Sequence, residues 1–382
     1  MTETNYDADA VARPTERAEH APLVRVALDA MGGDNAPHEI VLGAVRAAQA
    51  DPHLEIRLVG RPDALENAMT AGLVSADAAV RNRITTMIAA EVVEMDDHAA
   101  ASVRRKQDAS IRVAARLVAE GRADAVVSAG NSGGVMAAAI FELKRIPGLE
   151  RPAIGTLIPG KTGYTFMLDA GANTDVKPEW LAQFALLGDA YGRRILGLSS
   201  PRVGLLSNGE EETKGNSMTL DAHPLLKQLP IHFVGNVEGK SLFDGSVDVV
   251  VTDGFTGNVA LKTIEGVAEF LLTTIRDEAK TSPAGIAGGL LLKPTIGRIR
   301  ARADWRRIGG APLLGVNGVC IIAHGRSDAE AMKNAIIRGA EAVRGGVVSA
   351  MTDAIASASP AASGAAATEP AMAGLTTEKE RE

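Results

Sequence analysis

Five short loops of the sequence combine glycine with asparagine, serine or aspartate, a mixture that suits the binding of an anion. They are Asp29–Pro37, Ala129–Gly134, Leu168–Asn173, Ser207–Asn216 and Thr252–Asn258. Glycine allows the backbone to come close to a ligand, and a helix start presents unpaired N–H groups and the positive end of the helix dipole. The pattern therefore predicts a phosphate-like ligand held by loop amides.

Within and beyond these loops, several residues are candidates for contact with phosphate or an acyl substrate. They are Asp29, Gly32, Gly33, Asn131, Ser132, Gly133, Asp169, Asn173, Gly257 and His324. The 29–37 turn is equally consistent with a structural connection, because it is neither GxGxxG nor a Walker motif. His324 is equally consistent with a hydrogen-bonded structural histidine.

Two side chains are candidates for catalysis. Lys214 supplies a point charge for an anionic substrate, although a solvated loop lysine is the simpler interpretation if its loop is taken alone. Asn258 can donate its amide to an oxyanion that develops during a reaction, and it can equally cap its own helix.

The sequence offers no obvious protein nucleophile. Cys320, the single cysteine, sits in the apolar run Val319–Ile322, which favours a buried thiol. No GxSxG motif is present, and the seven histidines show no metal-ligand spacing, so we predict neither a metal nor a cofactor. An anion that is itself the nucleophile would explain this pattern.

Short aliphatic runs alternate with helical patterns along the chain, which predicts βαβ units. The expected strands are Val24–Leu28, Leu54–Val59, Ile84–Ile88, Ala125–Ser128, Ile154–Ile158, Thr165–Leu168, Val203–Leu206, Ile231–Val234, Val247–Val251 and Val316–Ala323. Examples of the expected helices are Pro37–Ala50, Ser110–Glu120, Gly133–Lys144, Pro178–Tyr191, Val259–Lys280 and Asp328–Val343. We predict an α/β fold with a Rossmann-like, doubly wound, mainly parallel sheet, whose five loops share one edge.

Length and charge bound the organisation. The 382 residues carry a formal charge of −7, which argues against a nucleic-acid binder. No linker interrupts residues 23–351, so we expect a single large domain. Residues 1–22 and 352–382 are low in apolar patterning and are expected to be disordered.

One segment, 280–307, combines an apolar half with a basic half and is expected to protrude. Leu290 and Leu291 could enter a bilayer interface, while Lys293, Arg298 and Arg300 could meet anionic lipid or an acidic carrier protein. A mobile hairpin with a solvated basic face is the alternative.

Several long motifs, in order from Val24 to Val348, resemble the PlsX phosphate acyltransferase family of bacterial phospholipid synthesis. They are Asp29–Pro37, Ser128–Gly133, Arg151–Ala153, Leu168–Asn173, Gly204–Glu211, Lys214–Asn216, Gly235–Gly239 and Asp253–Lys262. The resemblance implies a fold like that of the phosphotransacetylase and isocitrate dehydrogenase superfamily. It also implies reversible transfer of a fatty acyl group from acyl carrier protein to inorganic phosphate.

The resemblance further implies partners and a location. The acyl phosphate would serve the glycerol-3-phosphate acyltransferase of the membrane, and the protein would be a homodimer in the cytoplasm, attached peripherally to the inner membrane face. Rival interpretations are a phosphotransacetylase-like enzyme that uses short-chain acyl-CoA, and a non-catalytic scaffold at the membrane surface. A nicotinamide dehydrogenase is disfavoured, since the GxGxxG fingerprint is missing.

Overall fold

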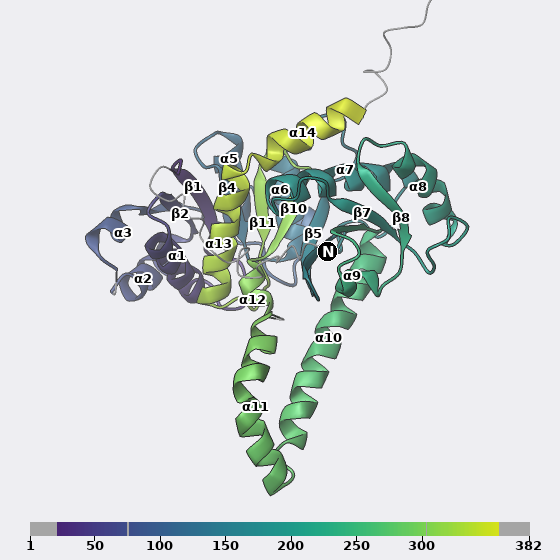
Figure 1. Ribbon diagram of the computed structural model, residues 1–382. Coiled ribbons are helices and arrows are strands. Elements are labelled where there is room, and N and C mark those ends of the chain that lie inside the picture. Colours follow the sequence, from purple (N-terminus) through teal and green to yellow (C-terminus); the bar gives the residue numbers. More distant parts are fainter. Residues whose placement is uncertain (1–20, 75, 303, 359–382) are drawn as a thin grey trace, which may run out of the picture.

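The computed structural model describes residues 21–358, except 75 and 303, and organises them around one large sheet (Figure 1). The strands of its first half are β1 (Val24–Asp29), β2 (Leu54–Gly60), β3 (Ile84–Ile88), β4 (Ala125–Ser128) and β11 (Val319–Ile322). Those of its second half are β6 (Gly163–Leu168), β7 (Arg202–Leu206), β8 (His232–Val237) and β9 (Val249–Val251). Between the halves lie β5 (Ala153–Gly160) and β10 (Ala311–Leu314). The order is β3-β2-β1-β4-β11-β10-β5-β6-β9-β7-β8.

Helices cover both faces of this sheet, as expected for a doubly wound fold. One face carries α1 (His38–Ala50), α13 (Ala329–Arg344), α7 (Pro178–Arg194) and α14 (Val347–Ala358). The other face of the first half carries α5 (Ser110–Ala119) and α6 (Ser132–Leu143). The remaining helices of the body are α2 (Pro62–Gly72), α3 (Ala78–Asn82), α4 (Ala99–Arg105), α8 (Ser217–Lys227), α9 (Ser241–Asp244) and α12 (Trp305–Ile308). The predicted fold class is confirmed.

The two halves of the sheet are each parallel, but they run in opposite directions. Strand β10 is antiparallel to both β11 and β5, and β5 is antiparallel to β6. Because of these three reversals, the carboxyl ends of β1 and β4 point one way along the strands and those of β6, β7 and β9 point the opposite way. The expectation that all five loops share one edge is therefore wrong, since the alternation of strands and helices does not reveal the reversals at β10 and β5. The loops after β1, β4 and β6 nevertheless meet at the junction of the two halves, through Asp34, Gly130 and Gly171.

Each predicted strand and helix overlaps an observed one, with bounds that differ by up to a few residues, and further helices such as α2 and α8 were not among those predicted. Three other differences concern β10, β11 and α14. Strand β10 was not expected, since Pro312 lies inside its four residues. The run predicted as Val316–Ala323 pairs as a strand only from Val319, after a turn that contains Gly318. Helix α14 continues to Ala358 and buries Ile355, so residues 352–358 are ordered and not part of a disordered tail. Residues 1–20 and 359–382, the rest of the expected tails, lie outside the described residues.

A long helical arm projects from the body (Figure 1). It consists of α10 (Gly254–Glu278) and α11 (Pro283–Arg302), so it begins much earlier in the chain than the expected segment 280–307. Helix α12 lies back at the body, where it packs on α13. No helix among the described residues is both long enough and apolar enough to cross a membrane.

Candidate functional site

A cavity of about 520 Å³ lies over the central strands, where the two halves of the sheet meet. Helix α10 forms one wall, and strand β5 supplies an opposing apolar wall through Ile154, Leu157 and Ile158. Polar side chains gather in the same cavity: Asp34, Ser132, Asn258, Lys262, Glu265, His324 and Ser327. A mostly apolar cavity with a few polar groups is the usual form of a small-molecule site.

Asp29 positions the loop that follows β4. The hydroxyl of Ser128 donates to its Oδ2 at 2.7 Å, and the same hydroxyl oxygen accepts from the amide of Gly130 at 3.0 Å. A Cβ at Gly32 would lie 2.6 Å from the Gly130 nitrogen, so only glycine permits this approach. Burial raises the pKa of Asp29. Asp29 and Gly32 therefore do not line the cavity themselves, but they support Gly130, which does.

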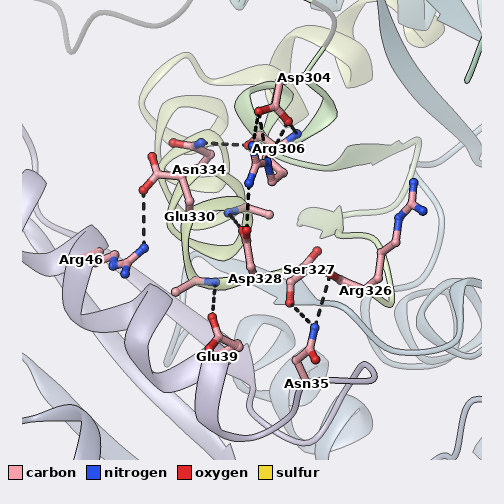
Figure 2. Close-up of polar contacts among 12 residues, drawn as sticks. Asn35, Glu39, Arg46, Asp304, Arg306, Arg326, Ser327, Asp328, Glu330 and Asn334 are labelled. Carbon is pink, nitrogen blue, oxygen red and sulfur yellow. Dashed lines mark hydrogen bonds and ion pairs between the residues drawn. The ribbon is translucent and has the colours of Figure 1, made fainter. Parts of the chain in front are cut away.

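The loop after β1 is tied to the loop after β11. Gly33 adopts φ +102°, and the next amide, that of Asp34, donates to the carbonyl of Gly325 at 2.8 Å. Figure 2 shows Asn35 reaching the backbone of the second loop, where its Nδ2 donates to the carbonyl of Ser327 at 3.2 Å. This contact holds His324 at the cavity.

His324 is exposed to the cavity, and its electrostatic surroundings are mixed. Partial burial lowers its pKa, and the positive charges of Arg326 and Lys262 lower it further. Glu265 and Asp34 act in the opposite direction. The neutral imidazole is therefore the favoured form near neutral pH, able to accept or donate one hydrogen bond.

The start of α6 brings backbone amides to the cavity. Asn131 is the N-cap, since its Oδ1 accepts from the amide of Gly134 at 3.0 Å, and its Nδ2 donates to the carbonyl of Met95 at 2.7 Å. Ser132 follows and lines the cavity, whereas Gly133 packs near Ala99. Of the expected trio, Ser132 alone lines the cavity, and Asn131 has a capping role.

Asp169 organises the loop after β6. Its two carboxylate oxygens accept five hydrogen bonds, from the amides of Ile154, Gly171, Ala172 and Asn173 and from the side chain of Asn173, at 2.8–3.2 Å. Burial raises its pKa, against the pull of these donors. Asn173 also donates to the carbonyl of Pro152 at 2.8 Å. Both predicted residues thus build the loop and do not line the cavity.

Asn258 lines the cavity from the second turn of α10. The N-cap of this helix is Asp253, which accepts from the amide of Thr256 at 2.8 Å, so the interpretation of Asn258 as a cap is wrong. Gly257 lets the helix pack closely on the preceding loop, because a Cβ there would lie 1.9 Å from the Asp169 carbonyl oxygen. The close packing of Gly257 on the Asp169 backbone therefore holds the adjacent Asn258 at the cavity.

The structure does not bring Lys214 to this cavity. It lies on the exposed loop between β7 and α8, and it is not among the residues that line the cavity. Asn236 holds this loop by donating to the carbonyl of Glu211 at 2.8 Å. A role for Lys214 in catalysis stays a prediction.

Two charged residues at the cavity were not selected from the sequence. Lys262 and Glu265 lie on α10, and their Nζ and Oε2 atoms are 2.9 Å apart. A signal was present, because Lys262 follows Asn258 by four residues and therefore shares its helix face. Asp34 also lines the cavity, although the predicted candidates of its loop are Asp29, Gly32 and Gly33.

The other chemical expectations concern Cys320 and metals. Cys320 is buried, and desolvation raises the pKa of its thiol to about 12, as expected for an inert cysteine. Within the described residues no three His, Cys, Asp or Glu side chains are grouped to hold a metal ion.

The predicted surface residues of the arm lie on α11. Leu290 is 67% exposed and Leu291 is 82% exposed. Lys293, Arg298 and Arg300 follow them on the same helix and are exposed as well. The arm thus presents apolar side chains next to basic ones.

Comparison with known proteins gives consistent matches along the chain. The model of the fatty acid synthesis protein family matches residues 24–350. A phosphate acyltransferase of Heliobacterium modesticaldum (strain ATCC 51547 / Ice1) is 52% identical over 313 residues, covering 82% of this chain and 92% of that protein. One from Anaeromyxobacter sp. (strain Fw109-5) is 49% identical over 344 residues, covering 90% and 94%.

Solved structures show a likeness of fold. A phosphotransacetylase from Streptococcus pyogenes superimposes with a TM-score of 0.57 at 17% identity, over 84% of this chain and 94% of that one. The EutD phosphotransacetylase from Staphylococcus aureus gives a TM-score of 0.55, with the same identity and coverage.

Proposed function

This chain belongs to the fatty acid synthesis protein family and is an acyltransferase whose relatives are phosphate acyltransferases, and on that premise we propose that it transfers a fatty acyl group from acyl carrier protein to inorganic phosphate. The observation that carries the proposal is a mostly apolar cavity that also presents polar side chains. Its apolar residues from β5 and α10 suit an acyl chain, and its polar groups suit phosphate and a reacting carbonyl.

The reaction needs no covalent enzyme intermediate. An oxygen of hydrogen phosphate attacks the thioester carbonyl, and the resulting tetrahedral oxyanion collapses with cleavage of the C–S bond. The thiolate takes the electron pair, and the proton that phosphate loses balances the released thiol. Cys320 is buried with a raised pKa, so it does not compete as nucleophile.

Residues of this chain would contribute orientation and charge stabilisation. Asn258 presents its amide in the cavity as a donor to the oxyanion, and the first amides of α6, beginning at Ser132, lack partners within their own helix. Asp29 and Asp169 are positioning residues, because each forms hydrogen bonds that hold a loop at or next to the cavity.

The direct test compares acyl donors. Purified protein is incubated with inorganic phosphate and either long-chain acyl carrier protein or acyl-CoA, and acyl phosphate is trapped with hydroxylamine. We expect product with the carrier-bound donor. Product from short-chain acyl-CoA alone would favour the phosphotransacetylase-like alternative, and binding of the carrier without product would favour the scaffold.

We also propose where the enzyme acts in the cell. The acyl phosphate is a reactive lipid intermediate, suited to a membrane glycerol-3-phosphate acyltransferase in phospholipid synthesis, and we place the protein, as a homodimer, at the cytoplasmic face of the membrane. The arm supports this placement, because Leu290 and Leu291 are exposed beside Lys293, Arg298 and Arg300. The same basic residues suit an acidic carrier protein.

Membrane attachment is tested by flotation with vesicles that contain anionic lipid. The double variant Leu290→Glu/Leu291→Glu should lose vesicle binding, whereas Val74→Glu, a change at a site 76% exposed outside the arm, should keep it. Unchanged flotation of the double variant would contradict the attachment through the arm.

A further inference from the structure

Resting on the proposed function, we propose that Lys262 binds the attacking phosphate and that Glu265 holds the Lys262 ammonium group until phosphate replaces it. Both side chains line the cavity, and their Nζ and Oε2 atoms are 2.9 Å apart. Lys262 keeps about half of its side-chain surface exposed, so an incoming anion can reach it. An ammonium group is a compact point charge that binds phosphate through charge-assisted hydrogen bonds.

Lys262 lies in a part of the cavity where charges of both signs meet. Across from α10, the loop after β11 brings His324 to the same cavity, and Arg326 follows two residues later. The charges of Lys262 and Arg326 both lower the pKa of His324, which places His324 within the electrostatic reach of both cations. The acids that face the same histidine are Glu265 and Asp34. Two cations and two acids therefore surround His324, and Lys262 is the cation among them that lines the cavity.

The position of Lys262 also fits the geometry of attack. Residues four apart on a helix have Cβ atoms about 5–6 Å from each other. Lys262 follows Asn258 by that interval, and both line the cavity. Phosphate bound at Lys262 would thus lie beside a thioester carbonyl whose oxygen accepts a hydrogen bond from the side-chain amide of Asn258. Lys214, on its exposed loop, has no such relation to the cavity.

Glu265 gives the proposal a signature that a structural role would not produce. The Lys262–Glu265 pair is partly exposed, and such ion pairs contribute little to stability. Replacing Glu265 by phosphate as the partner of Lys262 therefore costs little free energy. Removing the lysine charge should weaken phosphate binding, whereas removing the glutamate charge should strengthen it. Two neighbours that merely support the helix would change activity in the same direction.

The experiment measures phosphate dependence in the full chain with a saturating acyl donor. For Lys262→Met we expect the KM for phosphate to rise about 10- to 100-fold, since hydrogen bonds to charged groups are strong. For Glu265→Gln we expect it to fall by up to about 5-fold. Lys262→Arg should recover part of the affinity. Lys333→Met is the matched control, because Lys333 forms a similar pair with Glu330, at 3.0 Å and with i,i+3 spacing, outside the cavity.

A second measurement separates this inference from the proposed function. Inorganic phosphate binding is followed directly by the rise in Tm with phosphate concentration, which requires no acyl donor. Loss of that rise in Lys262→Met supports the inference even if carrier-bound acyl groups prove to be the wrong substrate. An unchanged phosphate response in Lys262→Met would overturn it, and so would the large loss occurring in Lys214→Met instead.

Discussion

The sharpest stability prediction concerns Asp169, a fully buried carboxylate that meets only N–H donors. Asp169→Asn keeps the shape of the side chain but replaces one acceptor oxygen by an NH₂ group. If the amide takes the Oδ2 position, it faces two donors, the amide and the side chain of Asn173. If it takes the Oδ1 position, it faces the amides of Ile154, Gly171 and Ala172. At least two partly buried N–H donors lose their acceptor in either orientation.

The magnitude follows from the cost of those unpaired groups. A fully buried donor without a partner costs about 1–3 kcal/mol, and these donors are partly buried, so the free energy of unfolding should fall by up to about 2–6 kcal/mol. Unfolding entropy is about 2.1 cal/mol/K per residue, or about 0.7 kcal/mol/K for roughly 340 residues. The expected decrease in Tm is therefore up to about 3–8 °C.

Asp29→Asn provides a matched control at the other edge of the sheet. Asp29 is also buried, but its Oδ1 accepts from the Met31 amide at 3.2 Å and its Oδ2 accepts from the Ser128 hydroxyl at 2.7 Å. The asparagine oxygen can keep the Met31 amide, and the new NH₂ group then faces a single hydroxyl that can rotate, whereas at Asp169 it faces fixed N–H donors. We expect a loss of about 1 kcal/mol or less. Thermal and urea unfolding of both variants at neutral pH decide the matter. An Asp169→Asn protein as stable as the wild type, or more stable than Asp29→Asn, would refute the hydrogen-bond reasoning.

Further predictions address the cavity and its supports. Asn258→Ala should lower kcat about 100-fold with little change in Tm, measured by acyl phosphate formation, because an oxyanion donor is lost. Gly257→Ala should destabilise the protein in thermal unfolding, since its Cβ has no room, whereas Gly266→Ala, in open space on the same helix, should stabilise it by up to about 1 kcal/mol. Cys320 should react with a thiol reagent only after unfolding, as its raised pKa of about 12 leaves a thiolate fraction on the order of 10⁻⁴ at pH 8. His324 should titrate below about 6.5 in an NMR titration, and because its pKa is lowered in the folded state, its contribution to stability should decrease as the pH falls.

Much of the fold was predictable because local patterns dictate it. Buried strands such as Val24–Asp29 and Ala125–Ser128 are continuous apolar runs followed by small-residue turns, and these features are visible without tertiary information. Strand β10 was missed because four residues containing a proline carry little periodic signal. That strand reverses the direction of the sheet, so its omission also produced the wrong expectation of a single edge.

A site residue could be predicted when its residue type has one common structural role, and less well when the type has several roles. Glycine at 32 was identified, and close backbone packing explains it. Aspartate and asparagine can bind a ligand or hold a loop, and the sequence does not state which donors surround them. Asp169 and Asn173 proved to hold a loop, whereas Asn258 faces the cavity. Lysine was the hardest type, because Lys214 and Lys262 both stand near glycine-rich motifs and only tertiary packing distinguishes them.

Helix α10 joins two features that the sequence presents as unrelated. Its first turns carry Asn258 and Lys262 at the cavity, and its last turns form the arm (Figure 1). A continuous helix of this length extends about 37 Å, and it transmits a tilt along its axis because its backbone hydrogen bonds are internal. The close contact of Gly257 with the preceding loop fixes the cavity end. A membrane or a carrier protein that restrains the arm would therefore act on the orientation of the same helix that presents the reacting groups, so vesicle binding and turnover should respond together to a break introduced in the middle of α10.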